Sequence, residues 1–226
     1  MFPIPDNIIS DYDALIMDLD GTVLDSMGLW NEVDIVFLSK RGIELTSDYT
    51  DYVKSVRIEQ AAEYTARRYG LSETPQEIMD EWLAMVDEAY RHEISVKPGV
   101  IEYLKSAREA GLKLGFATAL SFANARAALE NNGIFDLFDV HITLDDMEED
   151  INKEEPDIYL KVAQLLDAKP ERCLVFEDIP KALEGARKGH FGTCAVYDEV
   201  GSGAKETWEE MKSSSDFHIT AWNTSC

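Results

Sequence analysis

The stretch ALIMDLDGTVLDS, residues 14–26, decides the fold. Its first four residues are apolar and predict a short buried strand, because a turn signal follows them at once. Asp18 and Asp20 come directly after this run, separated by one leucine, and Gly21 then allows the chain to turn. A buried strand has no use for two carboxylates at its end unless something at that end requires them.

The composition is that of an ordinary globular protein with an unusually acidic surface. The chain has 226 residues, of which 45% are apolar and 29% charged, enough for one domain or for one domain with a small insert. Its formal net charge is -23, from 44 acidic and 21 basic residues. This charge argues against nucleic acid or an anionic membrane as a partner. Positive charge for an anionic substrate would have to be local or come from a metal.

The cysteines and the termini favour a reducing compartment. Cys173, Cys194 and Cys226 are odd in number and form no C-x-x-C pair, and the first two lie in apolar runs typical of core thiols. The segment 1–13 has no basic stretch followed by an apolar one, so we expect no signal peptide. No apolar run approaches the roughly 20 residues that span a bilayer. We therefore expect a cytoplasmic protein, and a monomer.

Short apolar runs rich in strand formers alternate with helical patterns along most of the chain. The predicted strands lie at 14–17, 112–117, 139–143, 173–177 and 193–197, with a last edge strand within 216–222. The predicted helices lie at 99–110, 121–132, 156–167 and 180–188. This alternation predicts an α/β fold, a doubly wound and mostly parallel sheet with helices on both faces.

Glycines and polar residues mark the ends of these elements. Gly111, Gly133 and Gly189 each follow a predicted helix, and we expect each to serve as a C-cap. The polar segment 201–215 predicts a loosely held surface helix and loop.

Residues 26–96 interrupt the alternation with helical patterns only. Trp30, Val33 and Phe37 have the spacing of one helical face, and Thr74, Pro75 and Glu77 form a capping box with proline at the first helical position. We predict a core domain of residues 1–25 and 97–226, and an all-helical inserted domain of residues 26–96.

Polar side chains follow three of the predicted strands. Asp18 and Asp20 end the first, Thr118 the second, and Glu177 with Asp178 the strand at 173–177. Ligands of open parallel sheets bind at this edge. Two like charges about 4 Å apart repel by roughly 4 kcal/mol at an effective dielectric of about 20. A divalent cation removes this repulsion, and oxygen ligands without nearby His or Cys favour Mg²⁺.

A lysine completes a set of groups suited to phosphoryl transfer, which needs charge neutralisation and positioning above all. Lys153 stands shortly before Pro156, in the loop that enters a predicted helix, and supplies a mobile positive charge. Asp18 can attack phosphorus, and Asp20 can donate and accept the proton. Gly21 turns the backbone away from the strand, with amides free to face a phosphate.

These motifs resemble those of the haloacid dehalogenase superfamily. DLDGTVLDS resembles its first motif, D-x-D-G-T-x-x-D-S; GFAT, KEEPDIY and VFED resemble the second, third and fourth, in the right order. An all-helical insert between the first and second motifs is similar to the cap of the β-phosphoglucomutase-like and phosphoglycolate-phosphatase-like branch. The resemblance implies a Rossmann-like core, a cap domain, and Mg²⁺-dependent hydrolysis of phosphate esters.

The resemblance also implies roles for single residues. Asp18 would form an aspartyl-phosphate, and Asp20 would be the general acid and base, with its backbone carbonyl on Mg²⁺. Thr118, Lys153 and Gly21 would hold the phosphoryl group.

Asp178 would be a further Mg²⁺ ligand, with Glu177 as a direct or water-mediated partner. The chain departs from the family pattern on the substrate side: Ala119 follows the threonine of the second motif, Glu154 replaces a proline, and Ile179 replaces a serine. These departures leave the substrate contacts open.

Three functions remain open at this point. We favour a phosphatase acting on a small phosphorylated metabolite such as a sugar phosphate. A sugar-phosphate mutase shares every core residue and needs a cationic contact from the cap; Lys54 and Arg57 in YVKSVRIEQ loosely resemble its K-G-V-S-R motif, or are plain surface charges. The third alternative, a non-catalytic binding or regulatory protein, is disfavoured because Asp18 and Asp20 are intact.

Overall fold

The computed structural model describes residues 6–148 and 151–222, and its contacts divide the chain into two compact units. Residues 1–27 and 94–226 form the sheet unit, and residues 28–93 form the helical unit. The helical unit begins two residues after, and ends three residues before, the limits of the helical insert predicted at 26–96. The reason is that the two connecting segments pair: Leu24 forms an antiparallel bridge with Val96, and the amide of Asp25 donates to the carbonyl of Ser95 at 2.9 Å.

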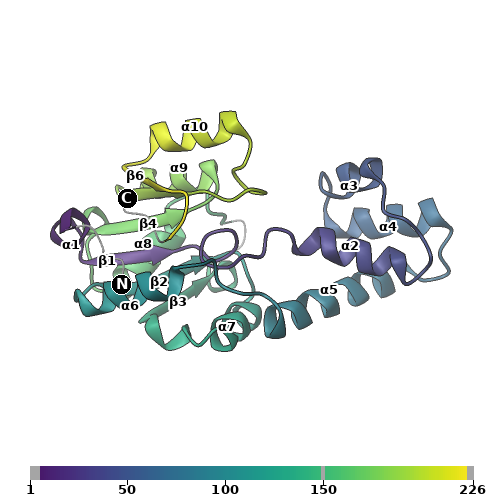
Figure 1. The fold of residues 1–226 in the computed structure, drawn as a ribbon, viewed down its shortest axis with the longest axis horizontal. Coiled ribbons are helices and arrows are strands. Elements are labelled where there is room, and N and C mark those ends of the chain that lie inside the picture. The colour runs from purple at the N-terminus through teal and green to yellow at the C-terminus, as the bar shows by residue number, and fades with distance from the viewer. Residues whose placement is uncertain (1–5, 149–150, 223–226) are drawn as a thin grey trace. The chain divides into compact units, whose positions relative to one another are not determined.

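The sheet unit contains a six-stranded sheet in which every neighbouring pair is parallel. The strands are β1 (Ala14–Met17), β2 (Lys113–Thr118), β3 (Val140–Thr143), β4 (Cys173–Glu177), β5 (Gly192–Val196) and β6 (Phe217–Ile219). Their spatial order is β3-β2-β1-β4-β5-β6 (Figure 1), which confirms the predicted α/β fold. β6 is the expected edge strand, and the central strands β1 and β4 are buried along their whole length.

Helices cover both faces of this sheet. They are α1 (Asp6–Asp11), α6 (Val100–Glu109), α7 (Phe122–Asn131), α8 (Asp157–Leu165), α9 (Pro180–Lys188) and α10 (Lys205–Ser214). Val175 of β4 packs in a core cluster with Val162 of α8, whereas the next residue, Phe176, meets the ring of Tyr103 of α6. Because successive strand residues point to opposite faces, α8 and α6 lie on opposite sides of the sheet.

One expectation about the ends of these elements is confirmed and one is wrong. Gly189 is the C-cap of α9, but its φ of -84° is not left-handed, whereas Gly111 and Gly133 follow α6 and α7 in the left-handed conformation. His190 takes the left-handed conformation instead, at φ 65°, and a side chain at Gly189 would press on Phe191. The segment 201–215 is not loosely held, because α10 anchors itself through the fully buried Met211.

The helical unit consists of α2 (Leu29–Ser39), α3 (Ser47–Val53), α4 (Ile58–Tyr69) and α5 (Pro75–His92). The predicted capping box opens α5: the amide of Glu77 donates to Thr74 Oγ1 at 3.3 Å, and the amide of Thr74 donates to Glu77 Oε2 at 2.8 Å. Val33 and Phe37 are buried as expected, and Phe37 packs against Trp82. Trp30 is different, because 47% of its surface is exposed.

The described residues also bear on compartment and membrane. Cys173 and Cys194 are buried cysteines, while Cys226 and residues 1–5 of the N-terminal segment lie outside the described part. Within residues 6–148 and 151–222, no helix combines the length and the hydropathy needed to cross a bilayer.

Candidate active site

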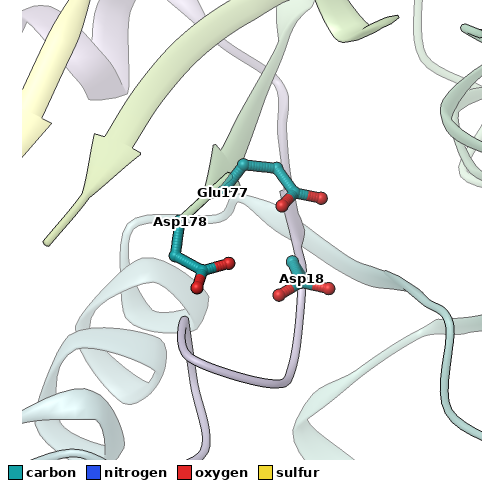
Figure 2. Close-up of side chains that lie close together, drawn as sticks. All are labelled: Asp18, Glu177 and Asp178. Carbon is teal, nitrogen blue, oxygen red and sulfur yellow. The ribbon is translucent and has the colours of Figure 1, made fainter. Parts of the chain in front are cut away.

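The strand register brings two acidic motifs together at one edge of the sheet. Met17 of β1 is paired with Phe176 of β4, and the amide of Asp18 donates to the carbonyl of Phe176 at 3.0 Å. Asp18 therefore emerges beside Glu177, although these residues are far apart in sequence. Figure 2 shows the carboxylates of Asp18, Glu177 and Asp178 turned toward one another.

These three acids form a compact and buried cluster. One carboxylate oxygen from each of Asp18, Glu177 and Asp178 lies within 4.8 Å of the others. Both carboxylate oxygens of Asp178 and Oε2 of Glu177 are buried and have no hydrogen-bond partner among the described residues. Buried polar atoms of folded proteins are almost always paired, so these oxygens are candidates to bind a ligand. Hard oxygen donors of this kind fit a divalent cation such as Mg²⁺.

Lys153 provides the positive charge within the cluster. Its Nζ donates to Asp18 Oδ1 at 2.5 Å and also forms an ion pair with Glu177 Oε1. Its side chain is only 13% exposed, so the mobile loop charge expected from the sequence is in fact a fixed, buried one. Gly185 of α9 makes this possible, because a Cβ there would collide with the backbone carbonyl of Lys153.

The single positive charge of Lys153 does not balance the negative charge of three carboxylates. The pKa values of the cluster are shifted accordingly. Burial, followed by the charge of Asp18, raises the pKa of Glu177 to about 8. Burial, followed by the charges of Asp18 and Glu177, raises the pKa of Asp178 to about 9. Burial alone would lower the pKa of Lys153, but the two carboxylates that it contacts outweigh burial and raise it. The site thus has a deficit of positive charge that a cation would remove.

Glycines enclose Asp178 and explain the turn after β1. A side chain at Gly21, which has φ 74°, would collide with Asp178 Oδ2 and come within 2.9 Å of Met27. A side chain at Gly201 would also collide with Asp178 Oδ2. The amide of Gly21 donates to the carbonyl of Leu24 at 3.0 Å, so the expectation that this amide faces a phosphate is wrong in this structure. Glycine is required here for space and for its backbone conformation.

Asp20 and Thr118 lie at the same edge but outside the three-acid cluster. Asp20 Oδ1 accepts a hydrogen bond from Ser26 Oγ at 2.5 Å, which fixes the orientation of a half-buried carboxylate. Thr118 is the last residue of β2 and is buried, and its hydroxyl oxygen accepts from the amide of Leu120 at 3.2 Å. The remaining candidates, Lys54 and Arg57, are exposed in the loop between α3 and α4 of the helical unit.

Two partners of the site escaped sequence reasoning. Tyr159 of α8 is fully buried and donates from its hydroxyl to Glu177 Oε1 at 2.8 Å. The only signal was a hydroxyl-bearing aromatic on an otherwise apolar helix face. Lys97 forms a nearly buried ion pair with Asp198 at 2.8 Å, and Asp198 also accepts from the amide of Gly201 at 2.8 Å. This pair holds the loop that carries Gly201 against Asp178.

Comparison with known proteins places this arrangement in a family. The model of the haloacid dehalogenase-like hydrolases matches residues 12–190. The chain belongs to the haloacid dehalogenase-like hydrolase family. Its relatives include β-phosphoglucomutase-like, phosphoglycolate-phosphatase-like and CbbY-like proteins with a helical cap, which confirms the branch expected from the motifs. The protein is accordingly a hydrolase of this family, and the non-catalytic alternative is set aside.

Individual relatives match over most of their length. YhcW of Bacillus subtilis (strain 168) is 33% identical over 189 residues, which cover 83% of this chain and 84% of YhcW. Hexitol phosphatase B of Escherichia coli (strain K12) is 23% identical over 186 residues, or 81% of this chain and 82% of that protein. The crystal structure of CbbY from Rhodobacter sphaeroides in complex with phosphate has a TM-score of 0.69 at 19% identity, covering 94% of this chain and 95% of CbbY. That likeness shows the common fold.

Proposed function

We propose that this hydrolase is a Mg²⁺-dependent phosphatase that acts on a small phosphorylated carbohydrate through an aspartyl-phosphate on Asp18. One observation carries the proposal: three buried carboxylates and one buried ammonium meet at the ends of β1 and β4, and three of the carboxylate oxygens have no partner among the described residues. The carbohydrate class is supported by the hexitol phosphatase among the relatives. The metabolite itself is left open.

In the proposed first step, an oxygen of Asp18 attacks the phosphorus of the ester, and the bond from phosphorus to the sugar oxygen breaks. Lys153 holds Asp18 through Oδ1, so the carboxylate is oriented before the substrate arrives. The buried ammonium also attracts the phosphoryl oxygens as negative charge redistributes. A Mg²⁺ ion bound to Asp18 and Asp178, with Glu177 as direct or water-mediated partner, would supply the further charge neutralisation that phosphoryl transfer requires.

Asp20 acts as the general acid in the first step and as the general base in the second. It donates a proton to the departing sugar oxygen and later takes one from the water that attacks the aspartyl-phosphate, which releases phosphate and restores Asp18. The hydrogen bond from Ser26 to Oδ1 holds the carboxylate in one orientation for these transfers.

The test is phosphate release from p-nitrophenyl phosphate and from glucitol 6-phosphate by the Asp18→Asn variant. The amide is nearly isosteric but cannot form the covalent intermediate, so turnover should fall by many factors of ten, each about 1.4 kcal/mol in barrier height. Asp13→Asn is the matched control, because Asp13 precedes the same strand at its opposite end and pairs with Arg172. Asp18→Asn activity within about tenfold of the wild type would contradict the proposal.

A sugar-phosphate mutase is the second candidate, because Lys54 and Arg57 are two exposed cations in one short loop of the helical unit. A mutase needs such cations to hold the second phosphate of a bisphosphate intermediate. β-Glucose 1-phosphate with a trace of bisphosphate distinguishes the two enzymes. We expect inorganic phosphate or no product. Net formation of glucose 6-phosphate that is lost in a Lys54→Ala, Arg57→Ala double variant would favour the mutase.

A further inference from the structure

The helical unit contains a cavity of its own, which the proposed phosphatase mechanism does not use. Its volume is about 370 Å³, and it is lined by Trp30 and Trp82, by Asp34 and Lys54, and by apolar side chains such as Val53 and Val56. Every lining residue belongs to α2, α3, α4, α5 or the loop between α3 and α4. The cavity is therefore a feature of residues 28–93 alone.

Asp34 is a buried carboxylate with too few hydrogen-bond donors. It is 8% exposed, and among the described residues it receives one hydrogen bond, from the Tyr49 hydroxyl at 3.3 Å. That hydroxyl is also 2.9 Å from Thr65 Oγ1, whose own hydrogen goes to the carbonyl of Ala61 at 2.8 Å. Tyr49 has one hydrogen to give, so it serves either Thr65 or Asp34. Burial correspondingly raises the pKa of Asp34 to about 6.

The other walls of the cavity offer donors and aromatic surface. Trp82 is almost completely buried, and its Nε1 has no hydrogen-bond partner among the described residues. The ammonium of Lys54 forms no ion pair with any described residue. The indole of Trp30 is half exposed, unlike a core side chain. An acceptor, two donors and an indole surface thus line one apolar space.

We propose that this cavity binds a polyhydroxylated compound, a sugar or a sugar alcohol, by its carbon chain and hydroxyl groups. A hydroxyl both donates and accepts, so it can satisfy Asp34 as well as Trp82 Nε1 and Lys54, while C–H groups pack on the indoles. A phosphate group would be repelled by Asp34, and an ammonium group by Lys54. A purely apolar ligand would leave Asp34 and Trp82 unpaired, at a cost of about 1–3 kcal/mol for each buried group.

Saturation-transfer NMR on the full chain tests this with D-glucitol, which carries no phosphate, so the outcome does not depend on phosphoryl transfer. We expect transfer to D-glucitol in the wild type and a loss of about tenfold or more in affinity in Asp34→Leu, the effect of one hydrogen bond to a charged group. Asp48→Leu makes the same substitution at an exposed position of α3 and should bind as the wild type does.

Three results would overturn the proposal: no transfer to D-glucitol in the wild type, equal transfer in Asp34→Leu, or equally strong binding of hexane-1,6-diol, which lacks the inner hydroxyls. If circular dichroism shows that Asp34→Leu is unfolded, Trp30→Ala replaces it, because Trp30 is half exposed and contributes little to the core. Unchanged binding of D-glucitol by Trp30→Ala would then overturn the proposal.

A second, independent observation concerns Tyr159. Glu177 Oε1 receives both the Tyr159 hydroxyl, at 2.8 Å, and the Lys153 ammonium, whereas Oε2 receives nothing from the described residues. We infer that Tyr159 is a positioning residue: it fixes Oε1 and thereby presents Oε2 to the space shared with Asp18 and Asp178. This inference rests on the proposed cation site.

Calorimetric titration of Mg²⁺ into full-length Tyr159→Phe tests this role without using activity. Partners that orient a metal ligand typically account for about 10–100-fold in affinity, so we expect at least a tenfold weaker Kd. Tyr12→Phe, which changes a tyrosine before β1, should bind Mg²⁺ normally. Wild-type affinity in Tyr159→Phe would overturn the positioning role alone, whereas a wild type that binds no Mg²⁺ would refute the cation site itself.

Discussion

Each unit contains a cluster of charged side chains, and the two clusters differ in how many of their charged groups have hydrogen-bond or ion-pair partners. In the helical unit, the guanidinium of Arg41 is 17% exposed and pairs with Glu73 at 2.9 Å and with Glu81 at 2.6 Å. It also donates to the carbonyl of Phe37 at 3.0 Å and lies over the Phe37 ring. Its donors thus have carboxylate and carbonyl partners within the unit.

In the cluster of the sheet unit, several charged oxygens have no such partners among the described residues. The ammonium of Lys153 pairs with Asp18 and Glu177 but not with Asp178, and three carboxylate oxygens of the cluster have no hydrogen-bond partner in the described part of the chain. Removing one partner of a buried charge pair is costly, whereas a buried carboxylate without a partner costs free energy that protonation or a bound cation offsets. The contrast therefore separates an ion-pair network whose donors have partners from an acid cluster that could hold a metal ion.

The largest expected effect is kinetic and concerns Asp20. Asp20→Asn keeps the shape of the side chain but cannot transfer a proton, so turnover should fall by about 10²- to 10⁴-fold. Rapid-quench kinetics with p-nitrophenyl phosphate should show that formation of the phosphoenzyme suffers less than its hydrolysis, because nitrophenolate leaves without a proton. Equal slowing of both steps would contradict the acid–base role. The unfolding midpoint should remain near that of the wild type.

The second-largest effect is expected from a steric change at Gly21. Gly21→Ala places a methyl group against Asp178, in addition to the strain of about 1 kcal/mol that a side chain suffers at positive φ. Gly42→Ala is the matched control, because Gly42 has φ 67° but open space around it. We expect Gly21→Ala to lose both Mg²⁺ affinity and free energy of unfolding, measured by titration and by urea denaturation, and Gly42→Ala to lose only the strain. Equal losses would show that Asp178 tolerates displacement.

The acid cluster also predicts how stability depends on pH. The pKa values of Glu177 and Asp178 rise from 4.5 and 3.8 to about 8 and about 9, so between these limits the folded state binds more protons than the unfolded chain. Without metal, the melting temperature should therefore fall as pH rises through this window, and Mg²⁺ should restore more of it at higher pH. Melts in EDTA and in Mg²⁺ measure this, and Asp178→Asn should flatten the decline. A metal-free melting temperature that rises from pH about 5 to about 8 would refute the crowding of these acids.

The smallest effect belongs to the cluster around Arg41. Glu81→Gln removes one carboxylate from Arg41, which retains Glu73 and the carbonyl of Phe37. Because such pairs near the surface contribute little, the free energy of unfolding should fall by less than about 1 kcal/mol, and kcat should not change. A loss of activity larger than the loss of stability would give this cluster a functional role that its paired donors argue against.

The sequence by itself determined the alternation of strands and helices and the edge at which Asp18, Thr118 and Asp178 emerge. Apolar runs, caps and turns are local signals, and parallel strands deliver their carboxyl ends to one edge whatever their exact order. The family motifs added the identity of the superfamily. Packing overrode several local expectations: Lys153 is buried rather than mobile, the amide of Gly21 is paired with Leu24, and the buried Met211 anchors α10.

The tertiary structure alone decided how the charges are held. Lys153 lies 135 residues from Asp18 in sequence, and its burial depends on the close approach that Gly185 permits. The hydrogen bond from Tyr159 to Glu177 and the donor deficit of Asp34 likewise arise between elements that only packing brings together. A sequence pattern states which groups are present at an edge. Their desolvation and their hydrogen-bond partners depend on distances in space, because both are set by whatever else the fold places within a few ångströms.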